Sequence, residues 1–301
     1  MTAYTLKQIK TFHRVATLQS ISKAASSLFV TQPAVTQQIQ QLEEAFGLPL
    51  IEPFGRTIQL TESGKIFFAL SERVIASLSE MESSMASLVN LQQGHIRLGI
   101  VSTTKYFVPM LIMEFKKDYP DITFDLKIAN RETMIHSLRN NLVDLVIMGR
   151  PPNKIEYDAI SFITNPLGIV SGEKYPIKSR PQYTLEDLKH EKFIAREEGS
   201  GTRLLMEKIF GDQGVKPEVF MSIDSNEMIK QLILANMGLT FISLRAVRRE
   251  LEAGLLKLIN VEGLPYVGHW YIMHRTEKKL SPSTEIFKHF IMEKAEDLVN
   301  Q

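Results

Sequence analysis

The sequence predicts an all-α winged helix-turn-helix at the N-terminus, followed by a long helix and an α/β domain of two Rossmann-like lobes. Three observations predict this fold class. Residues 1–60 divide into three short helical segments and a hairpin. One apolar stripe with a helical period runs through residues 61–91. Residues 94–301 alternate strand-like and helix-like segments, which is typical of parallel sheets covered by helices.

The composition excludes several classes of protein. The 301 residues include 35 basic and 34 acidic side chains, a formal net charge of +1, which excludes a strongly basic nucleic-acid coat and an acidic disordered tail. The lack of cysteine excludes disulfides, zinc–thiolate sites and a cysteine nucleophile. No apolar run reaches about 18 residues, and the N-terminus lacks the pattern of a secretory signal, so we expect a cytoplasmic protein.

The first two helical segments begin the helix-turn-helix. Apolar residues recur three or four positions apart between Leu6 and Ala16, which predicts one buried face. The second segment is short and contains Ala24 and Ala25. Because these side chains are small, they allow two helices to approach closely, as a helix-turn-helix requires.

The third helical segment begins at Thr31, a good N-cap, and ends at Gly47, with Pro33 in its first turn. Its apolar stripe consists of Val35, Ile39, Leu42 and Phe46. The other face carries threonine and glutamine side chains, at Gln32, Thr36, Gln37, Gln40 and Gln41. Glutamine can bond adenine and a threonine methyl can meet a thymine methyl, so this face suits the major groove of DNA. Taken alone, the pattern fits a solvated glutamine-rich helix equally well.

Residues 50–60 (LIEPFGRTIQL) predict a two-stranded hairpin, which after a helix-turn-helix is a wing. We expect Arg56 at its turn to reach a phosphate or the minor groove; the alternative is a solvated turn residue. The long helix after Thr61 carries apolar residues three or four positions apart, at Phe67, Leu70, Val74, Leu78, Met81, Met85 and Leu88. Their mean spacing is close to the coiled-coil period, which predicts dimerisation. Packing on the later domain of the same chain is the alternative.

The C-terminal part predicts two βαβ blocks, with lobe I at about 94–163 plus 268–301 and lobe II at about 164–267. The chain crosses between the blocks near Thr164 and His269, which makes a two-lobed clamp. Ligands bind beyond the carboxyl ends of such strands. The candidate effector residues follow strands or open helices: Ser102, Thr103, Thr104, Asn130, Arg150, Gly201, Thr202 and Arg203. Their hydroxyl, N–H and guanidinium groups favour an anion; helix capping and structural ion pairs are the alternatives.

Residues 24–64 resemble the signature of the LysR-type transcriptional regulators, with AASSLFVTQPAVTQQIQQLEEAFGLPL followed by RTIQLTESG. The resemblance covers the whole chain. It implies a winged helix-turn-helix DNA-binding domain at 1–60, a dimerising linker helix at 61–93 and an effector-binding domain at 94–301. It also implies that the effector-binding domain is similar to a type 2 periplasmic binding protein.

Mapped by position, the base-reading residues of that family correspond to Gln32, Pro33, Thr36 and Gln37, and its wing contact corresponds to Arg56. One departure matters. The family usually has phenylalanine and arginine where this chain has Ile51 and Pro53. We expect the loss of that arginine to weaken DNA binding or to shift a phosphate contact to Arg56.

Two further stretches resemble the regulators of Calvin-cycle (RuBisCO) operons: NRETMIHSLRNNLVDLVIMGRPP from Asn130, and AREEGSGTR from Ala195. This resemblance implies a small phosphorylated metabolite or a nucleotide as effector, and no cofactor. No metal site is expected, because the seven histidines show no ligand spacing. The expected partners are double-stranded promoter DNA, the effector, further copies of the chain in a homodimer or a dimer of dimers (homotetramer), and RNA polymerase.

Two other classes of function compete with a transcriptional regulator. A solute-binding protein without a DNA role would share the two lobes, but the basic N-terminal third argues against it. A two-lobed enzyme that tethers its cofactor through cysteine is opposed by the lack of cysteine. We therefore predict a regulator rather than an enzyme, with promoter binding that responds to a small anionic metabolite in the cleft between the lobes.

Overall fold

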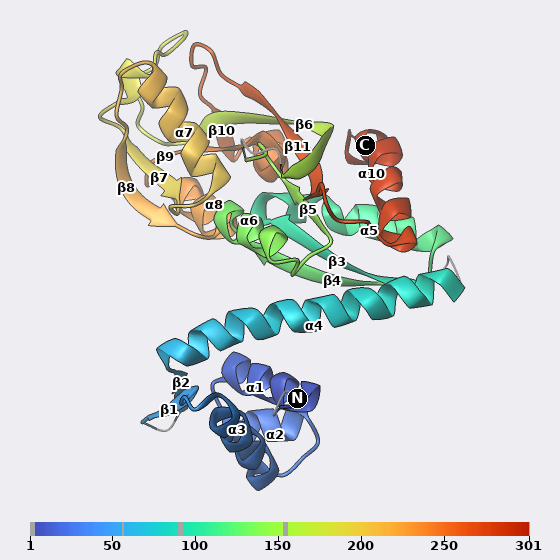
Figure 1. Cartoon of the computed structure of the whole chain (residues 1–301). Helices are drawn as coiled ribbons and strands as arrows, with labels where there is room; N and C mark the ends of the chain where they lie inside the picture. Colours follow the sequence, from blue (N-terminus) through green and yellow to red (C-terminus); the bar gives the residue numbers. More distant parts are fainter. Residues whose placement is uncertain (1–3, 56, 90–92, 153–155, 301) are drawn as a thin grey trace. The chain divides into compact units, whose positions relative to one another are not determined.

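The computed structural model describes residues 4–55, 57–89, 93–152 and 156–300. The chain forms two compact units, Met1–Glu82 and Ser83–Gln301, and the division falls inside helix α4 (Glu62–Val89) (Figure 1). Among these residues, no helix combines the length and the hydropathy that crossing a membrane requires. The same residues contain no cluster of acidic or histidine side chains that would hold a metal ion.

The first unit begins with the three predicted helices, α1 (Leu6–Leu18), α2 (Ile21–Ser27) and α3 (Gln32–Phe46). A capping box joins Thr5 and Gln8 at the start of α1, and Ser20 caps α2. Thr31 is the N-cap residue of α3, as expected, but its side chain makes no capping hydrogen bond. Gly47 ends α3 at φ +66°, in the left-handed region that glycine adopts most easily.

The core of this unit contains the predicted apolar and small side chains: Phe12, Val15, Ala16, Ala24, Ala25, Val35, Ile39, Leu42 and Leu50. The face predicted for α1 is partly wrong, because Gln8 and Thr11 are buried and Leu6 is exposed. Polar pairing between helices explains the difference. The Gln8 amide donates to the side-chain oxygen of Gln41 at 2.9 Å, and the Thr11 hydroxyl donates to that of Gln38 at 2.7 Å. Both buried groups are thereby satisfied.

The predicted wing follows as β1 (Ile51–Phe54) antiparallel to β2 (Thr57–Leu60). Pro53 is tolerated because each strand of this two-stranded hairpin is an edge strand. Helix α4 begins close to the hairpin. A Cβ on Gly64 would lie 1.9 Å from the carbonyl oxygen of Leu50, so only glycine permits this approach.

The apolar stripe predicted along α4 divides into two parts. Phe67 packs within the first unit, edge-on to Phe12 with 5.0 Å between the ring centroids. Farther along the helix the members of the stripe with described exposed side chains are Leu70, Val74, Met81 and Met85. Dimerisation through this face stays a prediction.

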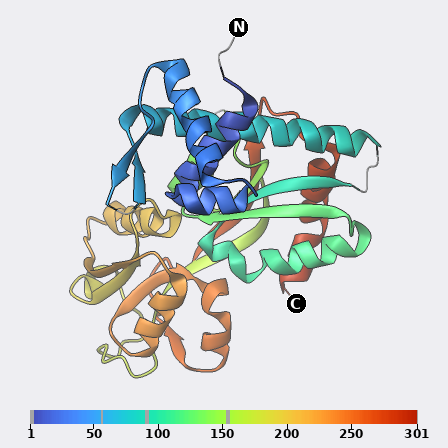
Figure 2. The same cartoon turned by 90° about the horizontal axis from the view of Figure 1, so that it is seen from below.

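The second unit is built on a nine-stranded sheet in the order β4-β3-β5-β11-β6-β9-β7-β8, with β10 paired to β6. Its strands are β3 (Gly94–Val101), β4 (Ile122–Ala129), β5 (Leu145–Met148), β6 (Tyr157–Gly172), β7 (Lys192–Arg196), β8 (Glu218–Ile223), β9 (Leu239–Ser243), β10 (Leu256–Leu258) and β11 (Tyr266–Arg275). β3, β4 and β5 are parallel in one half, and β7, β8 and β9 are parallel in the other. The teal β3 and green β4 run side by side in Figure 2.

The connection between the halves differs from the prediction. The sequence suggests only short strands at 168–171 and 270–273, whereas β6 and β11 are long antiparallel strands. Thr164 and His269, expected at the crossings, are partners in their register. Because each strand satisfies the backbone groups of the other, the chain crosses as sheet rather than as loop. The boundaries of the lobes themselves stay predictions.

Helices cover both faces of each half of the sheet. The first half carries η1 (Ser102–Tyr106), α5 (Val108–Asp118), α6 (Arg131–Arg139) and α10 (Pro282–Asn300); the second carries η2 (Glu186–Leu188), α7 (Gly201–Asp212), α8 (Asn226–Leu234), η3 (Leu244–Val247) and α9 (Arg248–Glu252). α10 packs against α5, as Figure 1 shows. The last helix therefore belongs to the half that contains the first strands, as predicted.

Candidate functional site

The residues selected for DNA contact lie at the N-terminal end of α3. Gln32, Pro33 and Gln37 are exposed there, and Thr36 is half-buried. The Gln32 amide donates to the hydroxyl of Ser22 in α2 at 2.9 Å, which orients the glutamine at the start of the helix. These four residues therefore share one end of α3, which would face a groove of the DNA.

The polar face of α3 is narrower than predicted. Gln41 accepts the hydrogen bond from Gln8 of α1 and so holds two helices together. Gln37 and Gln40 are exposed and make no side-chain hydrogen bond to another described residue. The first turns of α3 are thus the part available to DNA. Arg56, the expected wing contact, lies outside the described residues.

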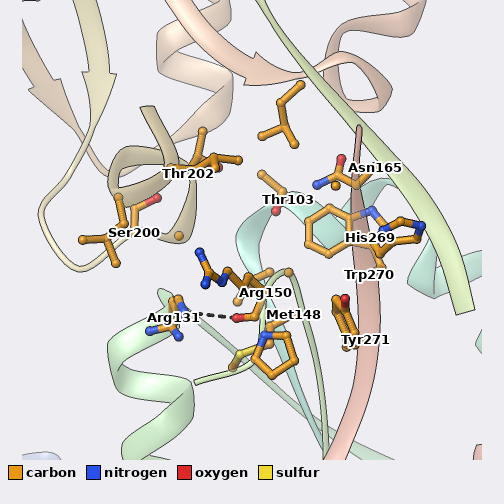
Figure 3. A pocket seen from close by; sticks show the side chains of 18 of the residues that line it. Thr103, Arg131, Met148, Arg150, Asn165, Ser200, Thr202, His269, Trp270 and Tyr271 are labelled. Carbon is orange, nitrogen blue, oxygen red and sulfur yellow. Dashed lines mark hydrogen bonds between the residues drawn. The ribbon is translucent and has the colours of Figure 1, made fainter. Parts of the chain in front are cut away.

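The second candidate site is a cavity of about 870 Å³ between the two halves of the sheet (Figure 3). Strand ends and helix starts supply its walls, as expected for parallel strands. From the first half come Ser102, Thr103, Asn130, Arg131 and Arg150; from the second come Ser200, Gly201 and Thr202; and the crossing strands supply Asn165, His269 and Trp270. The cavity therefore contains six of the eight effector residues that the sequence predicts.

The charge of this cavity is one-sided. Its lining includes five cationic side chains, from Arg131, Arg139, Arg150, Arg196 and Lys208, and no described lining residue is acidic. The Arg131 Nε donates to the carbonyl oxygen of Arg150 at 3.4 Å, the contact dashed in Figure 3. Burial and the charge of Arg150 together lower the pKa of Arg131. The negative charge of a bound anion would favour the charged form of Arg131 and so act against both effects.

The arginines of the cavity are not equivalent. Arg196 is buried and paired, because its Nε donates to Glu197 at 2.8 Å and its Nη1 donates to Asn226 at 2.8 Å. Arg131 and Arg150 form no ion pair with a described residue. We infer that Arg196 holds the wall in place, whereas Arg131 and Arg150 are available to a ligand.

Two predicted effector residues do not line the cavity. The Thr104 hydroxyl is fully buried and donates to the carbonyl oxygen of Val101 at 2.8 Å, so it stabilises η1. Arg203 pairs with Glu207 and lines a separate surface pocket on the other face of α7. Successive residues of a helix do not share a face, which is why Thr202 and Arg203 separate. The hydrogen bond of Thr104 and the ion pair of Arg203 fit the structural alternatives for these two residues.

Several lining residues were missed by reasoning from the sequence. Arg131 follows Asn130, the N-cap whose side chain accepts from the backbone of Thr133, and so lies in the first turn of α6. The sequence contains this signal, since a cation in the first turn of a helix opposes its dipole and is unusual without a ligand. Arg196 ends a buried strand and has no comparable signal. His269 and Trp270 were expected only to pack, and they also line the cavity.

Two contacts join the halves beside the cavity. In the first, the Tyr106 hydroxyl of η1 donates to Glu227 of α8 at 2.6 Å. Lys230 pairs with Glu227 at 3.1 Å and with Glu250 at 2.7 Å. Burial and then the hydrogen bond to Glu227 raise the pKa of Tyr106, which keeps the hydroxyl protonated. This joint lies a few residues from Thr103 in the cavity wall.

The second contact joins α6 to the loop before α7. The Glu132 N–H donates to the carbonyl oxygen of Gly199 at 3.4 Å. Gly199 has φ +80°, and a Cβ there would lie 2.7 Å from a carboxylate oxygen of Glu132. The backbone conformation therefore favours glycine, and any larger residue would also have to displace the Glu132 side chain.

Comparison with protein-family models covers both units. Residues 6–65 match the bacterial regulatory helix-turn-helix of the lysR family, and residues 90–296 match the LysR substrate binding domain. The chain belongs to the LysR family of transcriptional regulators. These matches confirm the resemblance found in the sequence. They do not support the alternative of a solute-binding protein without a DNA role.

Curated relatives of this LysR-family chain include two transcriptional regulators that match it over nearly their whole length. It is 39% identical to the HTH-type transcriptional activator CmpR of Synechocystis sp. over 95% of this chain and 94% of that protein. It is 38% identical to a RuBisCO operon transcriptional regulator of Allochromatium vinosum, with 96% of each chain covered. The second resemblance, to the Calvin-cycle subgroup, is confirmed as well.

Solved structures of LysR-type regulators show the same architecture. The regulatory domain of Synechocystis PCC6803 CcmR, in complex with 2-PG, matches with 34% identity and a TM-score of 0.63, over 66% of this chain and 96% of that one. Full-length CbnR in complex with its target DNA matches with 18% identity and a TM-score of 0.70, over 95% and 98%. The two family models and the curated relatives show that this chain is a DNA-binding transcriptional regulator with an effector-binding domain.

Proposed function

We propose that this regulator binds promoter DNA through the first turns of α3 and through the wing, and that a small anionic metabolite in the cavity changes that binding. Its DNA contacts are Gln32, Pro33, Thr36, Gln37 and Arg56. We propose that it acts in the cytoplasm without catalysing a reaction, as a homodimer or dimer of dimers that works with RNA polymerase. The exposed apolar side chains of α4 support the self-association.

One observation carries the proposal for the effector: Arg131 and Arg150 lie together without an acidic partner among the described residues. The opposite wall presents the start of α7, where Ser200, Gly201 and Thr202 line the cavity. The first N–H groups of a helix lack partners within the helix and attract anions. A ligand with two anionic groups would satisfy both walls. The regulatory domain of CcmR was solved with 2-PG, which is 2-phosphoglycolate, and this supports a phosphorylated carboxylate as the effector.

Calorimetry on the full-length protein with 2-phosphoglycolate tests the proposal. Three other ligands are compared with it. Glycolate and inorganic phosphate each carry one of its two anionic groups, and ATP represents the nucleotide alternative. We expect 2-phosphoglycolate to bind more tightly than either fragment. Arg150→Gln and Arg131→Gln should each weaken its binding at least tenfold, because a charge-assisted hydrogen bond contributes about 1.5–3 kcal/mol. Arg248→Gln, which alters an exposed arginine paired with Glu252, is the matched control.

Unchanged affinity in both cavity variants, with wild-type protein that still binds the probe, would place the ligand elsewhere. A preference for ATP over 2-phosphoglycolate would replace the phosphorylated carboxylate by a nucleotide.

The effect on DNA follows from linkage. An effector shifts the angle between the halves only as far as its affinities for the two states differ, and promoter DNA must change effector affinity by the same factor. Footprinting with and without saturating effector measures the first effect. We expect the protected region to shorten or move. An identical footprint would contradict a change in the spacing of the DNA-binding units.

A further inference from the structure

The turn between α2 and α3 has a regular hydrogen-bonding pattern with an unusual residue. The Phe29 N–H donates to the carbonyl oxygen of Ser26 at 3.3 Å, and the Val30 N–H donates to that of Ala25 at 3.1 Å. This pair of bonds is the Schellman motif that ends many helices. It places Phe29 at the position that glycine normally occupies, with φ +56°. The helix-turn-helix therefore has an aromatic residue where the backbone favours glycine.

The conformation of Phe29 is strained. A left-handed backbone brings the Cβ of a bulky residue close to its own peptide groups, so Gly, Asn or Asp usually occupy such positions. The other described residues with positive φ that are not glycine are Gln19, Asn141 and Asn236, all with polar amide side chains. Phe29 is the apolar exception among them. Asparagine would satisfy this turn with less strain.

Packing does not explain the phenylalanine. Its side chain is 96% exposed, the highest value among the exposed large hydrophobic residues that the structure describes. The ring belongs to no described aromatic pair or core cluster of the first unit. Val30, its neighbour, packs on the core instead. The fold thus exposes a whole aromatic ring at a strained position, and burial of that ring against a partner would supply favourable free energy that offsets the strain.

The surroundings of Phe29 fit duplex DNA. Phe29 precedes the N-cap of α3 by two residues and Gln32 by three, so its exposed ring is adjacent in the chain to the residues proposed to read bases. The nearby Lys23 of α2 is exposed and forms no ion pair with a described residue. The first 42 residues of the sequence contain no acidic side chain. A polyanion suits this surface better than a second basic protein surface does.

We propose that the Phe29 ring packs on a thymine methyl group and the adjoining deoxyribose at the edge of the major groove, and so helps to specify a thymine. Apolar side chains read thymine by contact with its methyl group, which no other base presents in that groove. The proposal rests on the DNA-binding role of the family. It adds an apolar determinant of specificity beside the polar side chains of α3.

The first test separates binding from folding. The duplex is selected from a random pool by the full-length wild-type protein, and affinity is measured by fluorescence anisotropy at several salt concentrations. Phe29→Asn keeps a residue that tolerates the left-handed turn but removes the ring. We expect affinity to fall about tenfold or more, as for the loss of a buried phenylalanine contact, with an unchanged salt slope. The melting temperature should rise by about 2–4 °C as strain is relieved.

Lys23→Gln is the matched control on the same surface. It should lower the salt slope, because a contact with a phosphate releases counterions and a contact with a methyl group does not. A structural role for Phe29 predicts that the melting temperature of Phe29→Asn falls together with its affinity, and this result would overturn the proposal.

The second test addresses the thymine directly. Each thymine of the selected duplex is replaced in turn by deoxyuridine, which lacks only the methyl group. We expect one position to weaken wild-type binding about fourfold, as for one buried methyl group, and to leave Phe29→Asn unaffected. Equal sensitivity of both proteins at every position would overturn the proposal. So would wild-type affinity in Phe29→Asn accompanied by a change in oligomer mass, which would assign the ring to a protein interface. If the wild-type protein selects no duplex, the DNA-binding role itself fails.

Discussion

Two groups of cationic side chains in the first half of the sheet differ in how their charge is balanced. Arg97 of β3 and Lys278 after β11 are buried, and both bond the carboxylate of Asp144, at 2.6 and 2.8 Å. Arg131 and Arg150 in the cavity share no described carboxylate. The first group balances its charge within the chain and ties strands together. The second has no such balance among the described residues, which is what we expect of a site for an anionic ligand rather than of a structural network.

The largest expected effect is the loss of stability when Asp144, the carboxylate that balances Arg97 and Lys278, is removed. Asp144→Ala leaves Arg97 and Lys278 buried without their carboxylate, so we expect the free energy of unfolding to fall by about 3–5 kcal/mol. Chemical denaturation measures it. Glu252→Ala, which removes an exposed ion pair with Arg248, should cost less than about 1 kcal/mol. Similar losses in the two variants would show that the buried network adds no more than a surface pair.

Acid should weaken the same network. Burial acts to raise the pKa of Asp144, but hydrogen bonds from Arg97 and the charge of Lys278 outweigh it, so the pKa lies below its ordinary value of 3.8. A depressed pKa adds stability that is fully present above the ordinary value and is lost as pH falls through the folded-state value. The stability difference between wild type and Asp144→Asn should therefore shrink below about pH 4. Denaturation curves from pH 7 to pH 3 measure this difference, and a constant one would refute the assignment.

A smaller effect is expected from the contact between Glu132 and Gly199, which joins the two halves of the sheet beside the cavity. Gly199→Ala places a methyl group against Glu132 and forces alanine to φ +80°, so the arrangement in which α6 contacts the loop before α7 becomes strained by about 1–3 kcal/mol. We expect about tenfold weaker effector binding, with little change in the Asp144 network. Calorimetry and small-angle scattering measure affinity and opening. Gly211→Ala in α7 is the control, since a Cβ there meets no atom within 4 Å; equal behaviour of the two variants would rule out the contact.

The smallest expected effect is the change in stability of the protein when Arg131 in the cavity is replaced. Arg131→Gln removes a half-buried charge next to Arg150 and breaks no described ion pair. We expect the free energy of unfolding to stay within about 1 kcal/mol of wild type, with any change in the stabilising direction. Thermal denaturation without effector measures it. A loss comparable to that of Asp144→Ala would mean that Arg131 has a structural role and would remove the contrast between the two groups.

Local patterns account for what could be predicted. The helices of the first unit follow from caps, breakers and apolar spacing, and the wing follows from its turn. The loops around the cavity follow from strand ends, so Ser102, Asn130 and Gly201 could be found. Arg203 could not be separated from Thr202, because the direction of a helix face toward a cavity depends on how α7 packs.

The sequence by itself determined the family, the helix-turn-helix and the general position of the cavity, because periodicity, caps and signature residues act over a few positions in the chain. Only the tertiary structure decided which polar groups are already satisfied: Gln41 and Arg196 have partners, whereas Gln37 and Arg131 face outward or into the cavity. The reason is that hydrogen bonds and ion pairs join residues far apart in sequence, and their partners are known only once the chain has folded.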